Sequence, residues 1–183
     1  MCDQTDSSLM EAVRQGDFNS LAVLFERHHK SLFHFFVHVN GNRDLSRDLV
    51  QDVFLRILKY RQSWQPDRSY TAWMYQIARN AQNDALSKRK VETELVDTDS
   101  VSNDAMDDKL NRKQEVATLR RAMARLPLEK RELLVLSRFE NLKYEQIASI
   151  LGVDVGTVKV RVYRAVRQLG QIFFELSGEK VSI

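Results

Sequence analysis

The residues best suited to binding chemistry are cations on a helix expected over 154–169. On an ideal helical wheel, its apolar stripe is formed by Val155, Val158, Val162, Ala165, Val166 and Leu169. The opposite arc presents Lys159, Val160, Arg161, Tyr163, Arg164 and Arg167. Four cations on one exposed face fit a helix that lies in the major groove of duplex DNA. Side chains at the centre of the arc should face bases, where Val160 could touch a thymine methyl, and those at its edges phosphates. A surface helix with scattered charge is the alternative.

A second candidate surface mixes aromatic rings with cations between residues 61 and 90. The rings are Trp64, Tyr70, Trp73 and Tyr75, and the interleaved cations are Arg61, Arg68 and Arg79. The helix that follows carries Asn80, Gln82, Asn83, Asp84, Lys88, Arg89 and Lys90. Rings stack on the bases of single-stranded nucleic acid at about 1–3 kcal/mol each, and amides and carboxylates can read base edges. The alternative is that Trp73 and Tyr75 are core residues and that the cations are simply solvated.

A third surface is an acidic stripe on the helix expected over 44–60. Its broad apolar side consists of Leu45, Leu49, Val50, Val53, Phe54, Ile57 and Leu58. The remaining narrow stripe holds Asp48, Gln51, Asp52, Leu55 and Lys59. An acidic stripe with a leucine in its middle is a plausible docking face for a basic partner helix, and an ordinary solvated face is the alternative.

Signatures of catalysis and of metal binding are missing from the sequence. His34 and His38 lie one helical turn apart, as paired metal ligands can, but no third ligand is evident nearby. The single cysteine, Cys2, excludes a disulfide framework and a CxxC zinc site. We find no glycine-rich phosphate loop, no nucleophile elbow and no paired carboxylates that can be placed in a pocket. The sequence therefore predicts no catalytic residue, no metal and no cofactor.

The elements that position these residues are helices. Only 6 glycines and 2 prolines occur among 183 residues, which argues against a loop-rich all-β fold. Helical periodicity predicts one or two helices over 18–40, and single helices over 44–60, 71–90, 116–125, 128–137, 144–151 and 154–169. The last two flank Gly152-Val153, and Asp154 is placed to cap the second, which is the helix-turn-helix pattern.

Charge divides the chain into three parts. Residues 1–90 carry 13 Lys and Arg against 10 Asp and Glu, residues 91–111 carry 1 against 7, and residues 112–183 carry 14 against 8. The middle part is rich in polar residues and has no aromatic residue, and this composition predicts a flexible acidic linker. We therefore expect an all-α protein of two small helical domains, 1–90 and 112–183, joined by linker 91–111. The chain shows no signal peptide and no apolar run long enough for a membrane span, so the expected location is the cytoplasm.

Three stretches together resemble the extracytoplasmic-function (ECF) sigma factors, the smallest members of the sigma-70 family of RNA polymerase subunits. They are residues 48–55 (DLVQDVFL), residues 70–80 (YTAWMYQIARN), and the run from YEQIA at 144–148 through LGV at 151–153 to GTVK at 156–159. The similarity covers about 18–90 and 116–174, which is most of the chain. The resemblance implies a sigma region 2 helical bundle in domain 1–90 and a sigma region 4 helix-turn-helix in domain 112–183.

The resemblance also implies roles for the three surfaces. Asp48, Gln51, Asp52 and Leu55 would dock on the clamp helices of the polymerase β′ subunit, and the β flap would be a further contact. The −10 promoter element would be melted and read by Trp64, Arg68, Tyr70, Arg79, Asn80, Asn83, Asp84, Lys88, Arg89 and Lys90. The −35 element would be read as duplex by Thr157, Lys159, Val160, Arg161, Tyr163, Arg164 and Arg167. Family members are usually held inactive by an anti-sigma factor.

Two departures from the family pattern affect promoter choice. Family members often have a small polar residue where this chain has Val160. The sequence of the loop at 65–68 also differs from the family pattern. The promoter sequence that this chain recognises therefore cannot be inferred from the promoters of other family members. The alternative functions are a stand-alone helix-turn-helix regulator, which would need a ligand pocket or receiver site in residues 1–90, and an enzyme acting on nucleic acid, which would need a carboxylate cluster.

Overall fold

All regular secondary structure in the described part of the chain is helical. The computed structural model describes residues 4–93 and 110–178. Within these ranges the long elements are α1 (Asp6–Arg14), α2 (Phe18–Asn40), α3 (Arg43–Tyr60), α4 (Tyr70–Thr93), α5 (Leu110–Arg125), α6 (Leu128–Leu134), α7 (Tyr144–Leu151) and α8 (Val155–Ser177). A 3₁₀ turn, η1 (Arg61–Ser63), follows α3, and a π-helical turn, η2 (Val135–Phe139), follows α6. The expected all-α fold is confirmed.

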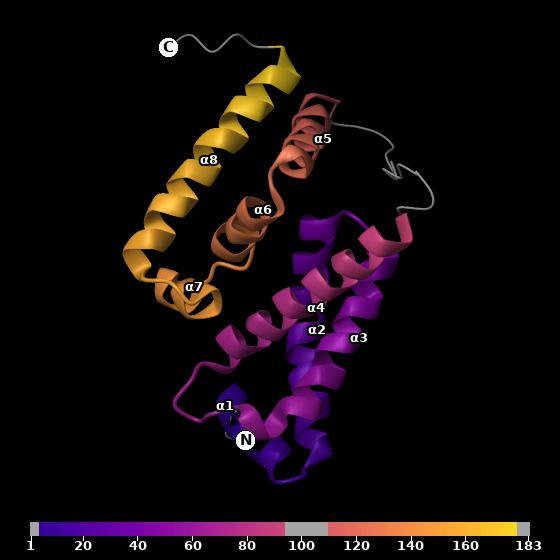
Figure 1. Cartoon of the computed structure of the whole chain (residues 1–183), viewed down its shortest axis with the longest axis vertical. Coiled ribbons are helices and arrows are strands. Elements are labelled where there is room, and N and C mark those ends of the chain that lie inside the picture. Colours follow the sequence, from indigo (N-terminus) through magenta and orange to yellow (C-terminus); the bar gives the residue numbers. More distant parts are fainter. Residues whose placement is uncertain (1–3, 94–109, 179–183) are drawn as a thin grey trace.

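Helices α1–α4 pack together at one end of the molecule (Figure 1). Helix α2 is one continuous helix that ends where Gly41 adopts the left-handed conformation at φ 72°. Asn42 then caps α3, because its side-chain oxygen accepts the amide hydrogens of Asp44 and Leu45 at 3.0 Å each. The glycine and the cap fix the reversal between two long helices that pack on each other.

The core of this bundle is apolar and aromatic. Leu24, Leu32, Phe35 and Phe36 of α2 are fully buried, and Tyr75 of α4 packs edge-on against Phe35 with ring centroids 5.3 Å apart. The expected apolar side of α3 also faces inward, since Leu49, Val50, Val53, Phe54 and Ile57 are all buried. Packing of this kind, rather than helix propensity, supplies most of the stability of helices in proteins.

Helix α1 was not expected from the sequence. It has only nine residues, which is too short for a clear periodic signal. Tertiary contacts hold it, because Leu9, Met10 and Val13 are buried against the bundle. Asp6, in its first turn, also accepts hydrogen bonds from α2, at 2.9 Å from Arg27 and 2.7 Å from the ring of His28.

Helices α5–α8 form the second helical unit (Figure 1). Helix α6 continues directly into η2, whose π character appears in the 3.0 Å bond from the Glu140 amide to the Val135 carbonyl. The sequence predicted an ordinary α-helix over 128–137, so the π-helical turn at its end is a departure from that prediction. Helix α8 is longer than expected and ends at Ser177.

The two helical units touch each other. Helix α4 packs on α7, and α2 packs on α6 and η2. The expected linker 91–111 falls mostly on residues outside the described ranges, since α4 extends to Thr93 and α5 begins at Leu110. The structure therefore describes how the units meet but leaves most of the expected linker undescribed.

Candidate nucleic-acid interface

The helix-turn-helix is built by local sequence signals. Helix α7 ends at Gly152, which takes the left-handed conformation at φ 64°, and α8 begins immediately after Asp154. A carboxylate oxygen of Asp154 accepts the amide hydrogen of Thr157 at 2.8 Å, and the Thr157 hydroxyl donates to the other oxygen. These hydrogen bonds from the hydroxyl and the amide of Thr157 hold the pKa of Asp154 below its ordinary value. The predicted turn and cap are confirmed.

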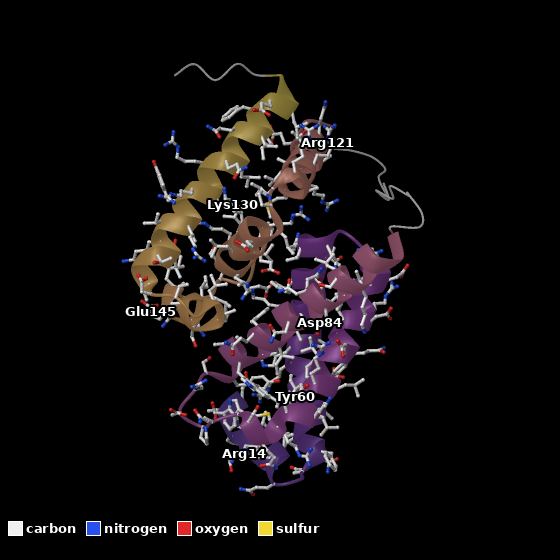
Figure 2. All side chains as sticks on the ribbon, viewed as in Figure 1. Arg14, Tyr60, Asp84, Arg121, Lys130 and Glu145 are labelled. Atoms are coloured by element: carbon white, nitrogen blue, oxygen red, sulfur yellow. The ribbon has the colours of Figure 1, made fainter. Side chains whose placement is uncertain are left out.

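The predicted arc of α8 is exposed. Val160 is 48% exposed and Tyr163 62%, and the cations of the arc are exposed as well. The guanidinium of Arg167 lies 5.9 Å from the centre of the Tyr163 ring, which orients both side chains on one face. Figure 2 shows side chains projecting along the side of α8 that faces away from α5 and α6. Thr157 differs from the other residues predicted to contact the −35 element, because it is half-buried and its hydroxyl donates a hydrogen bond to Asp154.

The residues predicted to contact the −10 element divide into three groups in the structure. Arg68 in the loop before α4 and four residues on α4 are exposed: Asn80, Asn83, Asp84 and Lys88. Arg79 is half-buried and faces the other helical unit, where its Nε lies 3.0 Å from a carboxylate oxygen of Glu132. The side chains of Arg89 and Lys90 lie outside the described residues.

Trp64 and Tyr70 form the third group, and the structure places both in the core. Trp64 is 1% exposed and Tyr70 2%, so in this conformation neither ring can stack on a base. Burial, together with the charge of Asp6, raises the pKa of Tyr70. The indole nitrogen of Trp64 and the hydroxyl of Tyr70 are buried without a hydrogen-bond partner, which is uncommon in native cores. Of the two aromatics for which a core role was weighed, Tyr75 is buried and Trp73 is partly buried.

The acidic stripe of α3 is a continuous exposed face. Leu55 is 65% exposed, and Asp48 and Gln51, in the two turns before it, are exposed as well. Asp52 is half-buried because Arg56 donates to it at 2.9 Å. Arg56 also donates to Asp84 of α4 at 2.7 Å, so one guanidinium joins the acidic stripe to the exposed face of α4.

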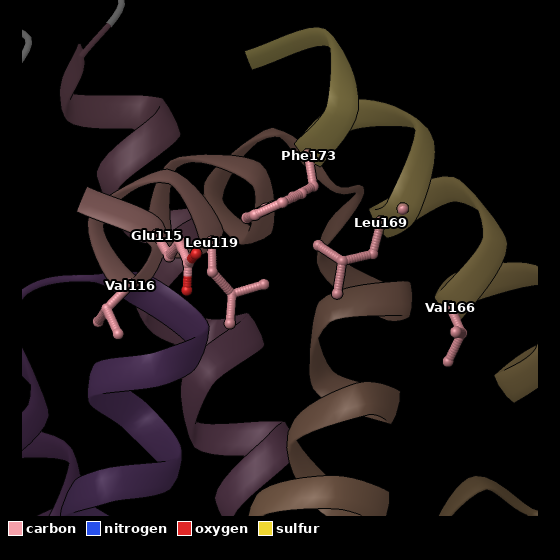
Figure 3. A pocket seen from close by; sticks show the side chains of 7 residues that line it. Glu115, Val116, Leu119, Val166, Leu169 and Phe173 are labelled. Atoms are coloured by element: carbon pink, nitrogen blue, oxygen red, sulfur yellow. The ribbon is translucent and has the colours of Figure 1, made fainter. Parts of the chain in front are cut away.

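An apolar groove lies between α5 and α8, with a volume of about 460 Å³ (Figure 3). Its walls are formed by Glu115, Val116, Leu119, Val166, Leu169, Gly170 and Phe173. Val166 was expected in the buried stripe of α8, and that expectation is wrong, because it is 41% exposed at the groove. The physical reason is that α5 and α8 diverge here and leave the outer edge of the stripe uncovered.

Two further features bear on function. No group of three or more histidine, cysteine or acidic side chains within 4–93 and 110–178 is arranged to hold a metal ion. His38 instead packs its ring on Phe139, with centroids 4.4 Å apart. Within the same ranges, no helix is both long and apolar enough to span a membrane.

Comparison with known proteins assigns the family. Residues 24–91 match the family profile described as Sigma-70 region 2, and residues 117–169 match Sigma-70, region 4. The ECF RNA polymerase sigma factor EcfG of Rhodopseudomonas palustris is 34% identical, over 79% of this chain and 80% of that protein. The RNA polymerase sigma factor CarQ of Myxococcus xanthus is 30% identical, over 93% and 98%. The chain belongs to the ECF sigma factors.

Solved structures agree with this family assignment. The sigma factor RpoE from Bartonella quintana, solved in complex with the anti-sigma factor NepR, superposes with a TM-score of 0.67 at 26% identity, covering 85% of this chain and 96% of that one. A structure of CnrH in complex with the cytosolic domain of CnrY gives a TM-score of 0.71 at 22% identity, over 91% and 96%, and shows a shared fold. The ECF sigma factor described here directs promoter-specific initiation of transcription by RNA polymerase. Sigma factors are non-catalytic initiation factors, and a stand-alone regulator is not favoured.

Several residues at the contact between the two units were missed by sequence reasoning. Glu132 and Glu140 reach from the second unit to α4 and α2. One signal was available for Glu132, because it stands four residues from both Leu128 and Leu136 and so interrupts an apolar stripe. Glu140 follows a π-helical turn that no periodicity indicated, and nothing in the sequence predicted its position.

Proposed function

We propose that each candidate surface serves one step of initiation. The exposed stripe of α3 binds the clamp helices of the polymerase β′ subunit, the exposed face of α4 reads the melted −10 element, and α8 reads the −35 element. The domain limits follow the same division: region 2 over 1–90, acidic linker over 91–111 and region 4 over 112–183. The chain itself performs no chemistry and works in the cytoplasm, where the polymerase is.

The observation that carries this proposal is the contrast between the faces of α4 and α8. The exposed side of α4 offers amides and a carboxylate, in Asn80, Asn83 and Asp84. These groups suit the exposed edges of unpaired bases. The exposed side of α8 offers four cations over the turns that follow its capped start, which suits the paired phosphates and base edges of a major groove.

Trp64 and Tyr70 keep a narrower role within this proposal. Both rings are buried, so their part in binding the −10 element consists of fixing the loop that carries Arg68 and the start of α4. Stacking on a base requires them to leave the core. Arg89 and Lys90 continue the basic end of α4 and are proposed to contact the DNA backbone.

The groove between α5 and α8 is proposed to receive an apolar side chain of the polymerase β flap. Its walls are apolar apart from Glu115, and it lies on the region that matches sigma region 4. A related sigma factor was solved with an anti-sigma factor bound. We infer that an anti-sigma factor also holds this chain inactive.

The direct test is reconstitution with core RNA polymerase. The purified chain is passed with core enzyme over a sizing column, and the complex is then assayed by run-off transcription on a promoter library. Co-elution together with new start sites is the expected result. Duplex DNA binding without core binding would overturn the proposal in favour of a stand-alone regulator.

A further inference from the structure

The contact between the two helical units uses a residue assigned to promoter binding. Arg79 on α4 faces α6, and its Nε lies 3.0 Å from Glu132 Oε2. Its Nη1 lies 3.5 Å from the carbonyl oxygen of Ile150 on α7. The Glu132 side chain is only 3% exposed and that of Arg79 21%, so water reaches the pair poorly. In this arrangement two of the three guanidinium nitrogens of Arg79 are directed at the second helical unit instead of at solvent.

A second set of polar contacts lies one turn away on α4. The Tyr75 hydroxyl donates to Glu140 Oε2 at 2.7 Å, and Ser31 of α2 donates to the same oxygen. Arg131 on α6 reaches the other way and donates to the carbonyl of Val39 on α2 at 2.6 Å. Side chains from α6 and from the end of η2 therefore hold both α2 and α4.

The Arg79–Glu132 pair is poorly suited to be a permanent part of the core. The second carboxylate oxygen of Glu132 is buried without a hydrogen-bond partner. Burial raises the pKa of Glu132, and the neighbouring Arg79 only opposes that effect. A buried ion pair gains little net stability, because the desolvation of both charges offsets their attraction. Separation of the units would return both groups to water, which lowers the cost of opening at this point.

The arrangement of the units also conflicts with simultaneous binding of both promoter elements. Elements named for positions 10 and 35 base pairs upstream of the start lie about 25 base pairs apart. That is ~85 Å of B-form DNA at ~3.4 Å per base pair. Helices α4 and α7 are in contact here, and α8, with 23 residues, is only about 35 Å long at 1.5 Å per residue. The two reading surfaces must move apart before both elements can be bound.

We propose that the free protein is self-inhibited, with Glu132 and Glu140 of region 4 acting as a latch that holds Arg79 and Tyr75 of region 2 and masks Arg79 from promoter DNA. The masking rests on the proposed role of Arg79 at the −10 element, whereas the latch itself does not. Binding to the polymerase or to DNA competes with the latch. The −35 surface of α8 stays exposed in the closed state.

The closed state is tested by small-angle scattering on the full-length free chain. A single compact body of 183 residues has a radius of gyration of about 16 Å. Two half-size bodies whose centres lie about 40 Å apart give about 23 Å by the same relation. We expect the wild type near the first value and Glu132→Gln/Glu140→Gln shifted toward the second, with unchanged helix content by circular dichroism. The matched control Glu145→Gln/Glu175→Gln removes two exposed charges and should stay compact.

A charge swap gives a second, independent measurement. Glu132→Arg alone places two cations together and should expand the protein. Adding Arg79→Glu restores an opposite-charge pair and should return the radius to the wild-type value. A wild type that is already expanded, or latch variants as compact as the control pair, would overturn the latch. Neither result depends on whether the chain assembles with polymerase.

DNA binding tests the masking. The probe is a single-stranded oligonucleotide that carries the −10 region of a promoter mapped by run-off transcription. Apparent affinity scales with the fraction of competent protein, so a latch that keeps nine-tenths of the chain closed predicts ~10-fold tighter binding by Glu132→Gln/Glu140→Gln. Binding of a −35 duplex should not change. Expansion in scattering without tighter binding of the oligonucleotide would overturn the masking of Arg79.

Discussion

The assignment of α8 to duplex DNA predicts different behaviour for cations at the centre and at the edge of its exposed arc. Val158, Val162 and Ala165 are buried and define the inward direction. Arg164 then lies near the middle of the outward arc and Arg161 at its edge. Central side chains should contact base edges and peripheral ones phosphates. The two alanine variants should therefore fail in different ways.

The expected effect of Arg161→Ala on the salt dependence of DNA binding follows from counterion release. If the three cations of the arc other than Arg164 contact phosphates, the logarithm of affinity falls with the logarithm of salt concentration at a slope of about −2.7. The dissociation constant then rises ~40-fold between 50 and 200 mM salt. Arg161→Ala removes one of these contacts, so the slope weakens to about −1.8 and the rise in dissociation constant to ~12-fold. The loss of affinity should be equal for a −35 duplex and for a scrambled duplex.

The expectation for Arg164→Ala is a loss of specificity. Removal of a base contact costs about 1–3 kcal/mol, which is about 5- to 150-fold in affinity. The loss should appear on the −35 duplex and be small on the scrambled one.

Fluorescence anisotropy titrations of labelled duplexes across 50–200 mM potassium chloride measure both effects. Arg125→Ala, an exposed cation on α5, is the matched control and should change neither. The reasoning fails if Arg164→Ala and Arg161→Ala both match the control, or if their losses are the same on both duplexes.

Three further predictions concern other parts of the molecule. Asp52→Arg should abolish co-elution with core polymerase while helix content is kept, whereas Glu26→Arg, an exposed control on α2, should bind normally; assembly by folded Asp52→Arg would refute the docking stripe. Trp64→Ala should lower the free energy of unfolding by about 3–5 kcal/mol in urea titrations, because the ring is fully buried, and a loss below about 1 kcal/mol would contradict its core role. Burial, with the charge of His34, lowers the pKa of His38 in the fold, so stability should fall as the pH drops from 7 through the unfolded value of 6.5 toward the lower folded one. His38→Gln should flatten that part of the pH profile of the urea midpoint, and an unchanged profile would argue against it.

The features of this fold that could be predicted are those specified by a few neighbouring residues in the sequence. Gly152 and Asp154 specify the turn and the start of α8 within three residues, and the structure confirms them. The limits of α2 and α3 were equally accessible, because Gly41 and Asn42 mark the break between two periodic segments. Each of these signals acts over a few residues and needs no knowledge of what packs where.

What the sequence left open depends on tertiary packing. The aromatic stretch before and within α4 had two interpretations, a stacking surface or a core. The burial of Trp64 and Tyr70 depends on tertiary neighbours such as His28 of α2, whose ring centroid lies 5.4 Å from that of Tyr70. Val166 shows the same limit, since periodicity places it at the edge of an apolar stripe but cannot tell that α5 stops short of covering it. Helical wheels identify the faces of a helix and not its neighbours.

The position of Glu132 within an apolar stripe bears directly on the proposed latch. A carboxylate in the apolar stripe of a helix is costly wherever that stripe is permanently buried, since a buried charge requires a complete set of partners. Here one carboxylate oxygen has Arg79 and the other has none. A permanent interface would be more stable with apolar side chains in place of both members of the ion pair, so Glu132→Leu combined with Arg79→Met should make the closed state harder to open if the surrounding side chains fill the space. A surface that alternates between a partner domain and water explains the glutamate, because the open state then exposes a hydrated charge instead of an apolar side chain.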